Sequence, residues 1–372
     1  MNVIHVIVGL NIGGAETALC RLVQSMNFCR HTVISLTDVG PLGLYLRTQG
    51  VNVVGLGIQP KQIAIPIFRL TKIIRDLNPD IIQTWMYHAD LVGGIAGVMA
   101  GVTHIVWGVR NTGIPQGKLS VTYLIIRVAA ALSYFIPTTI VCNSEAGKDS
   151  HIKIGYKKSK LLVIPNGFDV NILSPIGFNK KNIRLKYNLP KSLFIVGVIA
   201  RFDLLKGYET MVKVANKFLN NSNQNVIFVF VGKCVDSSNP FFNKSTKILG
   251  AGGNVVLLGE QKNIPEIIVA FDILCSPSIS EGFPNVVAEA MLMEKPCIVT
   301  DVGDSRLIVG DTGVVVPPDN ADSIIDSILM FSKMSISERI KLGGMARERI
   351  ITKYGIQKMV NSFKLVYESN VV

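Results

Sequence analysis

The sequence lacks the features that mark several large classes of protein. It has six cysteines, none closely paired and none at zinc-ligand spacing from a histidine, so reduced core thiols are expected rather than a disulfide or zinc framework. No run of about 20 apolar residues is free of charge, so no polytopic membrane protein is expected. Met1–Val8 has no basic n-region and is typical of a first strand, which favours a cytoplasmic location over secretion.

Charge is sparse but biased. Only 17% of the 372 residues are charged, yet the formal net charge is +12, and residues 1–176 carry 15 Lys and Arg against 8 Asp and Glu. This sign indicates an anionic partner: nucleic acid, an anionic membrane surface or a diphosphate substrate. Clusters of basic and aromatic residues are too few to favour nucleic acid. We therefore expect no nucleic-acid partner.

Two stretches bear on membrane contact. Leu119–Ile136 is largely apolar but contains Arg127, whose cost at the bilayer centre argues against spanning and favours a buried or interfacial helix. His151–Lys160 includes four lysines. Such a run is most simply a solvated face, but it also fits attraction to anionic lipid.

Short β-branched runs alternate with helix-length segments throughout the chain, which predicts α/β domains with parallel sheets. The strands expected in the first half are Val3–Val8, Thr32–Leu36, Ile81–Thr84, Ile105–Trp107 and Thr139–Asn143. Those expected in the second half are Phe194–Ala200, Ile227–Gly232, Val255–Leu258, Ile273–Ser276 and Cys297–Asp301. We expect two Rossmann-like, doubly wound domains facing across a cleft: 1–176 on the acceptor side, 177–352 on the nucleotide-sugar side, and 353–372 packing back on the first.

The most informative stretch follows the expected strand Ile273–Ser276. It reads Ser278-x-x-Glu281-Gly-Phe-Pro-Asn285-x-x-x-Glu289-Ala-Met. Its loop opens a helix, and the backbone N–H groups of a helix N-terminus bind phosphate readily. Taken alone, Glu281 and Glu289 are more simply a helix-end residue and a surface residue.

A second block, Gly197 to Gly207, is a strand followed by a loop that carries Arg201 and Lys206. Two cations at a strand end can stabilise negative charge that develops on a leaving group. A surface pair beside a turn is the plainer alternative.

Together these motifs resemble glycosyltransferase family 4, retaining enzymes of GT-B fold. The resemblance runs along nearly the whole chain, from the glycine loop Gly9–Thr17 through Pro165-Asn166-Gly167 and Arg201-x4-Lys206 to the glutamate pair. It implies that Glu281 faces the transferring sugar and Glu289 binds the ribose. It also implies that the amides of Gly282, Phe283, Asn285 and Val286 meet the donor sugar and diphosphate.

In the first half, the resemblance assigns Gly13 to the acceptor or phosphates and Gly14 to the donor, although a glycine turn after a strand is common. His88 follows the strand Ile81–Thr84 and matches a histidine that many relatives place near the donor sugar, although a lone histidine is more often structural. Arg110 ends the next strand and could meet the acceptor or its phosphate. Catalytic roles are expected for Glu281, His88, Arg201 and Lys206.

The resemblance implies a retaining hexosyltransferase that uses a nucleotide sugar, by family habit a UDP-sugar. No Asp-x-Asp motif is present, so neither a metal nor another cofactor is expected. The basic first half suggests a polyprenyl-diphosphate-linked glycan acceptor in O-antigen or capsule synthesis, with the enzyme peripheral on the cytoplasmic face of the inner membrane. A GT-B epimerase, a phosphorylase-like enzyme and a non-catalytic nucleotide-sugar-binding scaffold are the alternatives.

Overall fold

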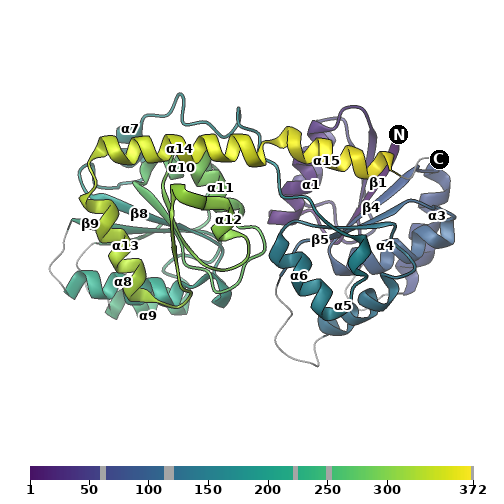
Figure 1. The fold of residues 1–372 in the computed structure, drawn as a ribbon, viewed down its shortest axis with the longest axis horizontal. Coiled ribbons are helices and arrows are strands. Elements are labelled where there is room, and N and C mark those ends of the chain that lie inside the picture. The colour runs from purple at the N-terminus through teal and green to yellow at the C-terminus, as the bar shows by residue number, and fades with distance from the viewer. Residues whose placement is uncertain (59–63, 113–120, 221–224, 249–253, 370–372) are drawn as a thin grey trace. The chain divides into compact units, whose positions relative to one another are not determined.

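The computed structural model describes residues 1–58, 64–112, 121–220, 225–248 and 254–369. The chain divides into two compact units (Figure 1): unit 1 comprises Met1–Gly167 and Tyr354–Val372, and unit 2 comprises Phe168–Lys353. Unit 1 therefore ends before the boundary at 176 that the sequence suggested. The last helix belongs to unit 1.

Unit 1 is a seven-stranded parallel sheet flanked by helices, in the order β3-β2-β1-β4-β5-β6-β7. Its strands are β1 Asn2–Ile7, β2 Arg30–Ser35, β3 Asn52–Gly55, β4 Ile81–Trp85, β5 Ile105–Val109, β6 Thr139–Cys142 and β7 Leu161–Val163. Its helices are α1 Gly14–Ser25, α2 Gly40–Thr48, α3 Ala64–Leu77, α4 Tyr87–Ala100, α5 Val121–Leu132, α6 Glu145–Ile154, the short η1 Lys158–Lys160 and α15 Ile356–Glu368.

Unit 2 is a six-stranded parallel sheet in the order β10-β9-β8-β11-β12-β13. Its strands are β8 Phe194–Ile199, β9 Val226–Val231, β10 Val255–Leu257, β11 Ile273–Ser276, β12 Cys297–Thr300 and β13 Val314–Val316. Its helices are α7 Lys180–Lys186, η2 Leu204–Lys206, α8 Tyr208–Asn220, α9 Pro240–Ile248, α10 Ile264–Ala270, α11 Asn285–Leu292, α12 Ser305–Val309, η3 Gly310–Thr312, α13 Ala321–Lys333 and α14 Ile336–Tyr354, which runs on to the unit boundary.

The central strands are buried on both faces. β9 has the sequence VIFVFV with every residue buried, and β4 is buried throughout as well. Continuous apolar strands of this kind are typical of parallel sheets covered by helices on both sides. These observations confirm the predicted α/β class of two Rossmann-like domains.

Helix α15 completes the core of unit 1. Its residues Met359, Phe363 and Tyr367 are buried in one cluster with residues of β1 and α1, and Figure 1 shows α15 alongside α1. Met359 also accepts a hydrogen bond on Sδ from the Gly167 amide at 3.1 Å. The C-terminal segment is therefore an integral part of unit 1.

The two stretches considered for membrane contact are both helical in part. Residues 119 and 120 of Leu119–Ile136 lie outside the described residues, and its residues 121–132 form α5. His151 does not belong to a basic face: it is buried, its ring contacts the Tyr87 hydroxyl at 2.9 Å, and burial lowers its pKa. Within the part of the chain described, no helix is both long and apolar enough to cross a membrane.

Candidate active site

The glutamate motif and the Arg-Lys motif lie at one point of the unit 2 sheet. They follow β11 and β8, which are hydrogen-bonded neighbours although other strands separate them in the sequence. The strand order reverses between these two strands. Ligands of open α/β sheets bind outside the carboxyl ends of the strands at such a switch point.

At this point Lys206 and Glu281 form an ion pair. Lys206 Nζ lies 2.6 Å from Glu281 Oε1, and the two side chains are 25% and 13% exposed. The Ser278 hydroxyl donates to the same carboxylate oxygen at 2.7 Å. Thr300, at the end of β12, in turn donates to the backbone carbonyl of Ser278. The Glu281 carboxylate is thus held in a fixed, partly buried position by two side-chain donors.

The two loops are fastened to each other by their backbones. Gly207 has φ +70°, and a Cβ there would lie 2.0 Å from the Pro277 carbonyl oxygen. The Ile279 amide donates to the Leu205 carbonyl at 2.8 Å. Only glycine can adopt this φ without strain and admit such an approach. The contact sets the distance between the Lys206 loop and the Glu281 loop.

The Glu281 loop is also braced from β12. Gly303 has φ +57°, and a Cβ there would lie 2.4 Å from the Glu281 carbonyl oxygen and 2.6 Å from that of Gly282. The Asp304 amide donates to the Gly282 carbonyl at 3.0 Å. Loops that follow three adjacent strands therefore fix the backbone that leads into α11.

Helix α11 presents a single partly open face. Asn285, Val286 and Glu289 are half-buried, whereas the rest of the helix is buried. These three residues are spaced i, i+1 and i+4 and share one side of the helix. The N-cap residue Pro284 makes no side-chain cap bond. The structure therefore places Glu289 on the same side of α11 as Asn285 and Val286, the first two residues of the helix.

The side chain of Phe283 is buried rather than open to a ligand. Its side chain is 6% exposed and stacks on Phe168 with ring centroids 6.0 Å apart. Gly282, which precedes it, is half-buried.

Arg201 follows β8, but the structure pairs it with Asp203 rather than with Glu281. Its Nη2 lies 3.1 Å from Asp203 Oδ2, and its side chain is 70% exposed. Asp203 also caps η2 by accepting from the Leu205 amide at 3.0 Å. Desolvation opposes ionisation of Asp203, but these hydrogen bonds and the charges of Arg201 and Lys206 outweigh it and lower its pKa.

Sequence reasoning missed two residues of this arrangement. Ser278 binds the Glu281 carboxylate, and its place three residues before Glu281 was a usable signal. Asp203 forms an ion pair with Arg201 and caps the η2 turn. An aspartate immediately before a short helical turn is a common N-cap and could have indicated this role.

The corresponding switch point of unit 1 lies between β1 and β4. Gly13 is the extended N-cap of α1, and Gly14 is its first residue. His88 lies in the first turn of α4, after β4, and is exposed. Partial desolvation lowers the pKa of His88, so its imidazole is neutral at physiological pH. The glycine loop and His88 therefore follow adjacent strands.

Arg110 follows β5, the next strand of that sheet. Its side chain is 8% exposed, and its guanidinium carbon lies 4.5 Å from the centroid of the Trp85 ring. None of its three side-chain nitrogens has a hydrogen-bond partner among the described residues. Burial lowers its pKa to about 10. The Arg110 guanidinium thus has N–H donors of the kind that bind carboxylates and phosphates.

No group of three or more His, Cys, Asp or Glu side chains that could hold a metal occurs within the described ranges.

Both units match family models of glycosyltransferases. Residues 12–172 match the family model described as Glycosyltransferase Family 4, and residues 179–349 match Glycosyl transferases group 1. The chain is 25% identical over 311 residues to the Escherichia coli UDP-Gal:alpha-D-GlcNAc-diphosphoundecaprenol alpha-1,3-galactosyltransferase, covering 82% of this chain and 79% of that protein. It is 27% identical over 252 residues to the Campylobacter jejuni N,N'-diacetylbacillosaminyl-diphospho-undecaprenol alpha-1,3-N-acetylgalactosaminyltransferase, covering 66% and 65%.

Among solved structures, Anabaena HepE in complex with UDP superimposes with a TM-score of 0.85 at 21% identity, covering 99% of this chain and 100% of that one. At this identity the match shows the fold.

Proposed function

Because the chain belongs to the family 4 glycosyltransferases and has their GT-B fold, we propose that it transfers a sugar, with retention of anomeric configuration, from a UDP-sugar to a polyprenyl-diphosphate-linked glycan. The observation that carries this proposal is the Lys206–Glu281–Ser278 cluster beside the N-terminus of α11. Two relatives named for undecaprenyl-diphosphate-linked substrates support the acceptor class. The relatives also include an E. coli enzyme named for UDP-Gal, which supports a UDP-sugar donor.

In this proposal unit 2 binds the donor. Glu289 binds the ribose hydroxyls, and the amides of Gly282, Phe283, Asn285 and Val286 bind the diphosphate and sugar. Amides at a helix N-terminus suit an anion because their partial positive charge is already oriented toward it. Gly14 of unit 1 contributes to donor binding.

The acceptor hydroxyl attacks the anomeric carbon as the bond from that carbon to the diphosphate oxygen breaks. The hydroxyl proton passes to the departing phosphate oxygen on the same face, which gives retention. Lys206 and Arg201 neutralise the charge that develops on the diphosphate, so no metal is required. Preorganised charge of this kind is worth roughly two to three orders of magnitude in rate. Glu281 stabilises the positive charge on the sugar ring, and neutral His88 hydrogen-bonds a sugar hydroxyl.

Unit 1 binds the acceptor in this proposal, through Gly13 and Arg110. The guanidinium of Arg110 binds the acceptor diphosphate. The enzyme acts at the cytoplasmic face of the inner membrane, held to anionic lipid, in synthesis of O-antigen or capsule. Relatives from capsular polysaccharide and lipopolysaccharide synthesis support this setting.

The test is release of nucleoside diphosphate from a panel of UDP-, GDP- and ADP-sugars, with and without a lipid-diphosphate glycan, in the presence of EDTA. We expect acceptor-dependent release of UDP from one donor. Glu281→Gln and Lys206→Met should lower kcat by roughly 100-fold or more. The matched control Glu209→Gln removes an exposed glutamate in the first turn of α8 and should leave kcat unchanged. The anomeric configuration of the product is read by NMR.

Other outcomes identify the alternatives. Tight nucleotide binding without release from any donor would point to a binding scaffold. Conversion of a donor without acceptor would point to an epimerase, and phosphate-dependent turnover to a phosphorylase. Unchanged kcat in Glu281→Gln would remove Glu281 from the mechanism.

A further inference from the structure

A second group of charged side chains lies at the amino ends of the unit 2 strands, opposite the carboxyl ends that Lys206 and Glu281 follow. It surrounds an open pocket of about 850 Å³. The pocket is lined by Asp272, Phe194, Val226 and Pro296, which lie at or just before the amino ends of β11, β8, β9 and β12. The Lys206–Glu281 pair follows the carboxyl ends of β8 and β11. The pocket is therefore separate from the proposed donor site.

The pocket lining carries an excess of positive charge. Six of its residues are cationic and two are acidic: Lys180, Lys181, Arg184, Lys191, Lys295 and Arg339 against Asp272 and Glu294. Among the described residues only Asp272 of the two carboxylates forms an ion pair, with Lys180 at 2.7 Å and Arg184 at 2.8 Å. The Asp272 carboxylate thus pairs with two of the six cations, and the other four cations form no ion pair with a carboxylate of the pocket.

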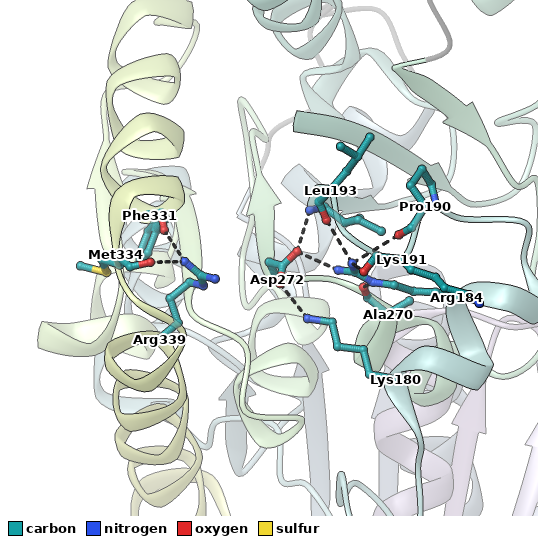
Figure 2. A network of polar contacts seen from close by, with 11 residues as sticks. Lys180, Arg184, Pro190, Lys191, Leu193, Ala270, Asp272, Phe331, Met334 and Arg339 are labelled. Atoms are coloured by element: carbon teal, nitrogen blue, oxygen red, sulfur yellow. Dashed lines mark hydrogen bonds and ion pairs between the residues drawn. The ribbon is translucent and has the colours of Figure 1, made fainter. Parts of the chain in front are cut away.

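Figure 2 shows how these side chains are held. Arg184 reaches Asp272 and also donates to the carbonyls of Ala270, Pro190, Lys191 and Leu193, so it is a structural tie. Arg339, on α14, donates to the carbonyls of Phe331 and Met334, which carry no net charge. Those contacts fix the guanidinium of Arg339 without neutralising it.

Lys295 is the least compensated of the six. It precedes Pro296 and β12 and is half-buried, and its amine makes no hydrogen bond and no ion pair with any described residue. The charged groups around it are Lys180 and Arg184 of α7, Asp272 before β11, and its neighbour Glu294. Desolvation, followed by repulsion from Lys180, lowers the pKa of Lys295 to about 8. Desolvation also lowers the pKa of Lys180, with repulsion from Arg184 and Arg339 adding to it.

We propose that this pocket is a binding site for a phosphate-bearing anion, held by Lys295 together with Lys180, Lys191 and Arg339. A phosphate group offers several acceptor oxygens and a charge of about −2, which matches converging lysines and an arginine. Ile336 and Ile340 line the same pocket, are 70% and 62% exposed, and lie one turn apart on α14. Exposed isoleucines beside cations suit an anionic lipid, whose headgroup would bind the cations. The cations alone suit a soluble phosphate.

The first experiment titrates inorganic pyrophosphate into the full-length protein by calorimetry. Lys295→Gln and Lys191→Gln should each weaken binding by about tenfold. The control Lys353→Gln makes the same charge change at an exposed position outside the pocket and should have no effect. Lys206→Met alters only the donor site, which can itself bind a diphosphate, so it should leave the Lys295-dependent part of the binding in place. Pyrophosphate binding of equal strength in wild type and Lys295→Gln, or no binding in either, would overturn the proposal.

A second measurement follows protons. At pH 8 about half of the Lys295 amines are neutral. A bound anion raises the pKa of that amine, so binding should take up as much as about half a proton, seen as a dependence of the binding enthalpy on the buffer. Lys295→Gln should abolish the uptake. If proton uptake is undiminished in Lys295→Gln, another group takes up the proton, which would count against the proposal.

The third arm identifies the source of the anion. Vesicles containing phosphatidylglycerol are added to wild type and Lys295→Gln with and without pyrophosphate. Vesicle binding that is weakened in Lys295→Gln and displaced by pyrophosphate assigns a lipid headgroup. Pyrophosphate binding at the pocket, combined with vesicle binding that neither change alters, assigns a soluble phosphate. The inference does not depend on sugar transfer, and its tests measure binding alone.

Discussion

Arg110 is a residue whose position costs stability. Its buried guanidinium has no hydrogen-bond partner in the part of the chain that the structure describes, and an apolar side chain would fill this place at lower free energy. Such a cost is expected where a ligand completes the bonding. The diphosphate of the proposed acceptor has the charge and the oxygen geometry to do so.

We therefore expect Arg110→Met to increase stability and impair acceptor use. Methionine keeps the packing on Trp85 and removes the charge, so the free energy of unfolding should rise by about 1–3 kcal/mol. KM for the lipid-diphosphate acceptor should rise by about tenfold or more, with little change in KM for the donor. Denaturant titration and steady-state kinetics measure the two effects.

Arg110→Lys separates charge from geometry at the same position. It retains the positive charge but loses the planar set of five donors, so it should recover only part of the acceptor KM. An Arg110→Met variant that is less stable and has an unchanged acceptor KM would show that Arg110 is a structural residue.

Asp90 predicts a pH dependence of stability. Its carboxyl is fully buried in the first turn of α4, accepts from the Thr84 hydroxyl at 2.6 Å and from the Gly108 amide at 3.2 Å, and has no partner on Oδ2 within the described ranges. Desolvation outweighs these bonds and raises its pKa to about 8. Between pH 4 and pH 8 the folded protein thus keeps a proton that the unfolded chain has released.

Stability therefore falls as pH rises through this window, by up to about 1.4 kcal/mol per unit from this group. Asp90→Asn retains an oxygen that accepts both hydrogen bonds but does not titrate. Urea unfolding at pH 5 and pH 8 should show that the variant gains stability relative to wild type at the higher pH. Parallel pH profiles for the two proteins would mean that Asp90 is ionised in the folded state.

At the scale of elements, the site depends on two loops fixed to each other at Gly207 and Pro277. Gly207→Ala places a Cβ against the Pro277 carbonyl and imposes φ +70° on a residue that disfavours it. We expect the loops to separate, which disturbs the Lys206–Glu281 pair, lowers kcat by about tenfold or more and costs about 1–3 kcal/mol of stability.

Gly155→Ala is the matched control. Gly155 also ends a helix with positive φ, at +107°, but a Cβ there would meet nothing within 4 Å. It should cost stability through backbone strain and leave kcat unchanged. Equal kcat values in Gly207→Ala and Gly155→Ala would show that contact between the loops does not govern turnover.

Sequence patterns predicted the central strands and missed three edge strands. β3, β7 and β13 have only three or four residues and lie at sheet edges. An edge strand contacts one neighbour and is only partly covered, so it needs neither the length nor the continuous apolar run that reveals a buried strand. Their pairing is decided by the sheet that is already formed.

The candidate site was predictable in part for a related reason. Motifs that follow strands were recognisable because Glu281 and Lys206 occur in short, ordered patterns. Their contact at 2.6 Å depends on β8 and β11 being neighbours, which is a property of strand order. The burial of Arg110 was not predictable, since it depends on Trp85 of another strand and on the core that α15 completes.

At the scale of the whole molecule, both units use the same arrangement. In each sheet the first strand of the sequence is central, and the next two strands add toward one edge. The strands that follow start again beside the first strand and add toward the other edge. The segments that follow β1 and β4 in unit 1, with Gly13 and His88, therefore correspond to those that follow β8 and β11 in unit 2, with Lys206 and Glu281. The fold thus supplies an equivalent switch point in each unit, and ligands of open α/β sheets bind at such points.

The net charge of +12 leads to the last prediction, which concerns membrane binding by unit 1. Val121 and Leu124 of α5 are exposed, as are Tyr134 and Phe135, which follow the helix in the sequence. Two lysines lie beside Tyr134: Lys157 Nζ lies 5.0 Å from the centroid of its ring, and Lys160 Nζ donates to its carbonyl at 2.9 Å. Apolar side chains beside cations are the pattern of a surface that docks on anionic lipid.

In a vesicle sedimentation assay, binding should require an anionic lipid and weaken as salt is raised, because exposed charges are screened. Lys157→Gln should weaken binding by about fivefold, the equivalent of about 1 kcal/mol for one lysine near the surface. Leu124→Ser should weaken it at all salt concentrations, since the apolar contribution is not screened. Lys213→Gln, on α8 of unit 2, is the control for lost charge alone. If Lys157→Gln and Lys213→Gln weaken binding equally, net charge rather than the α5 face holds the protein to the membrane.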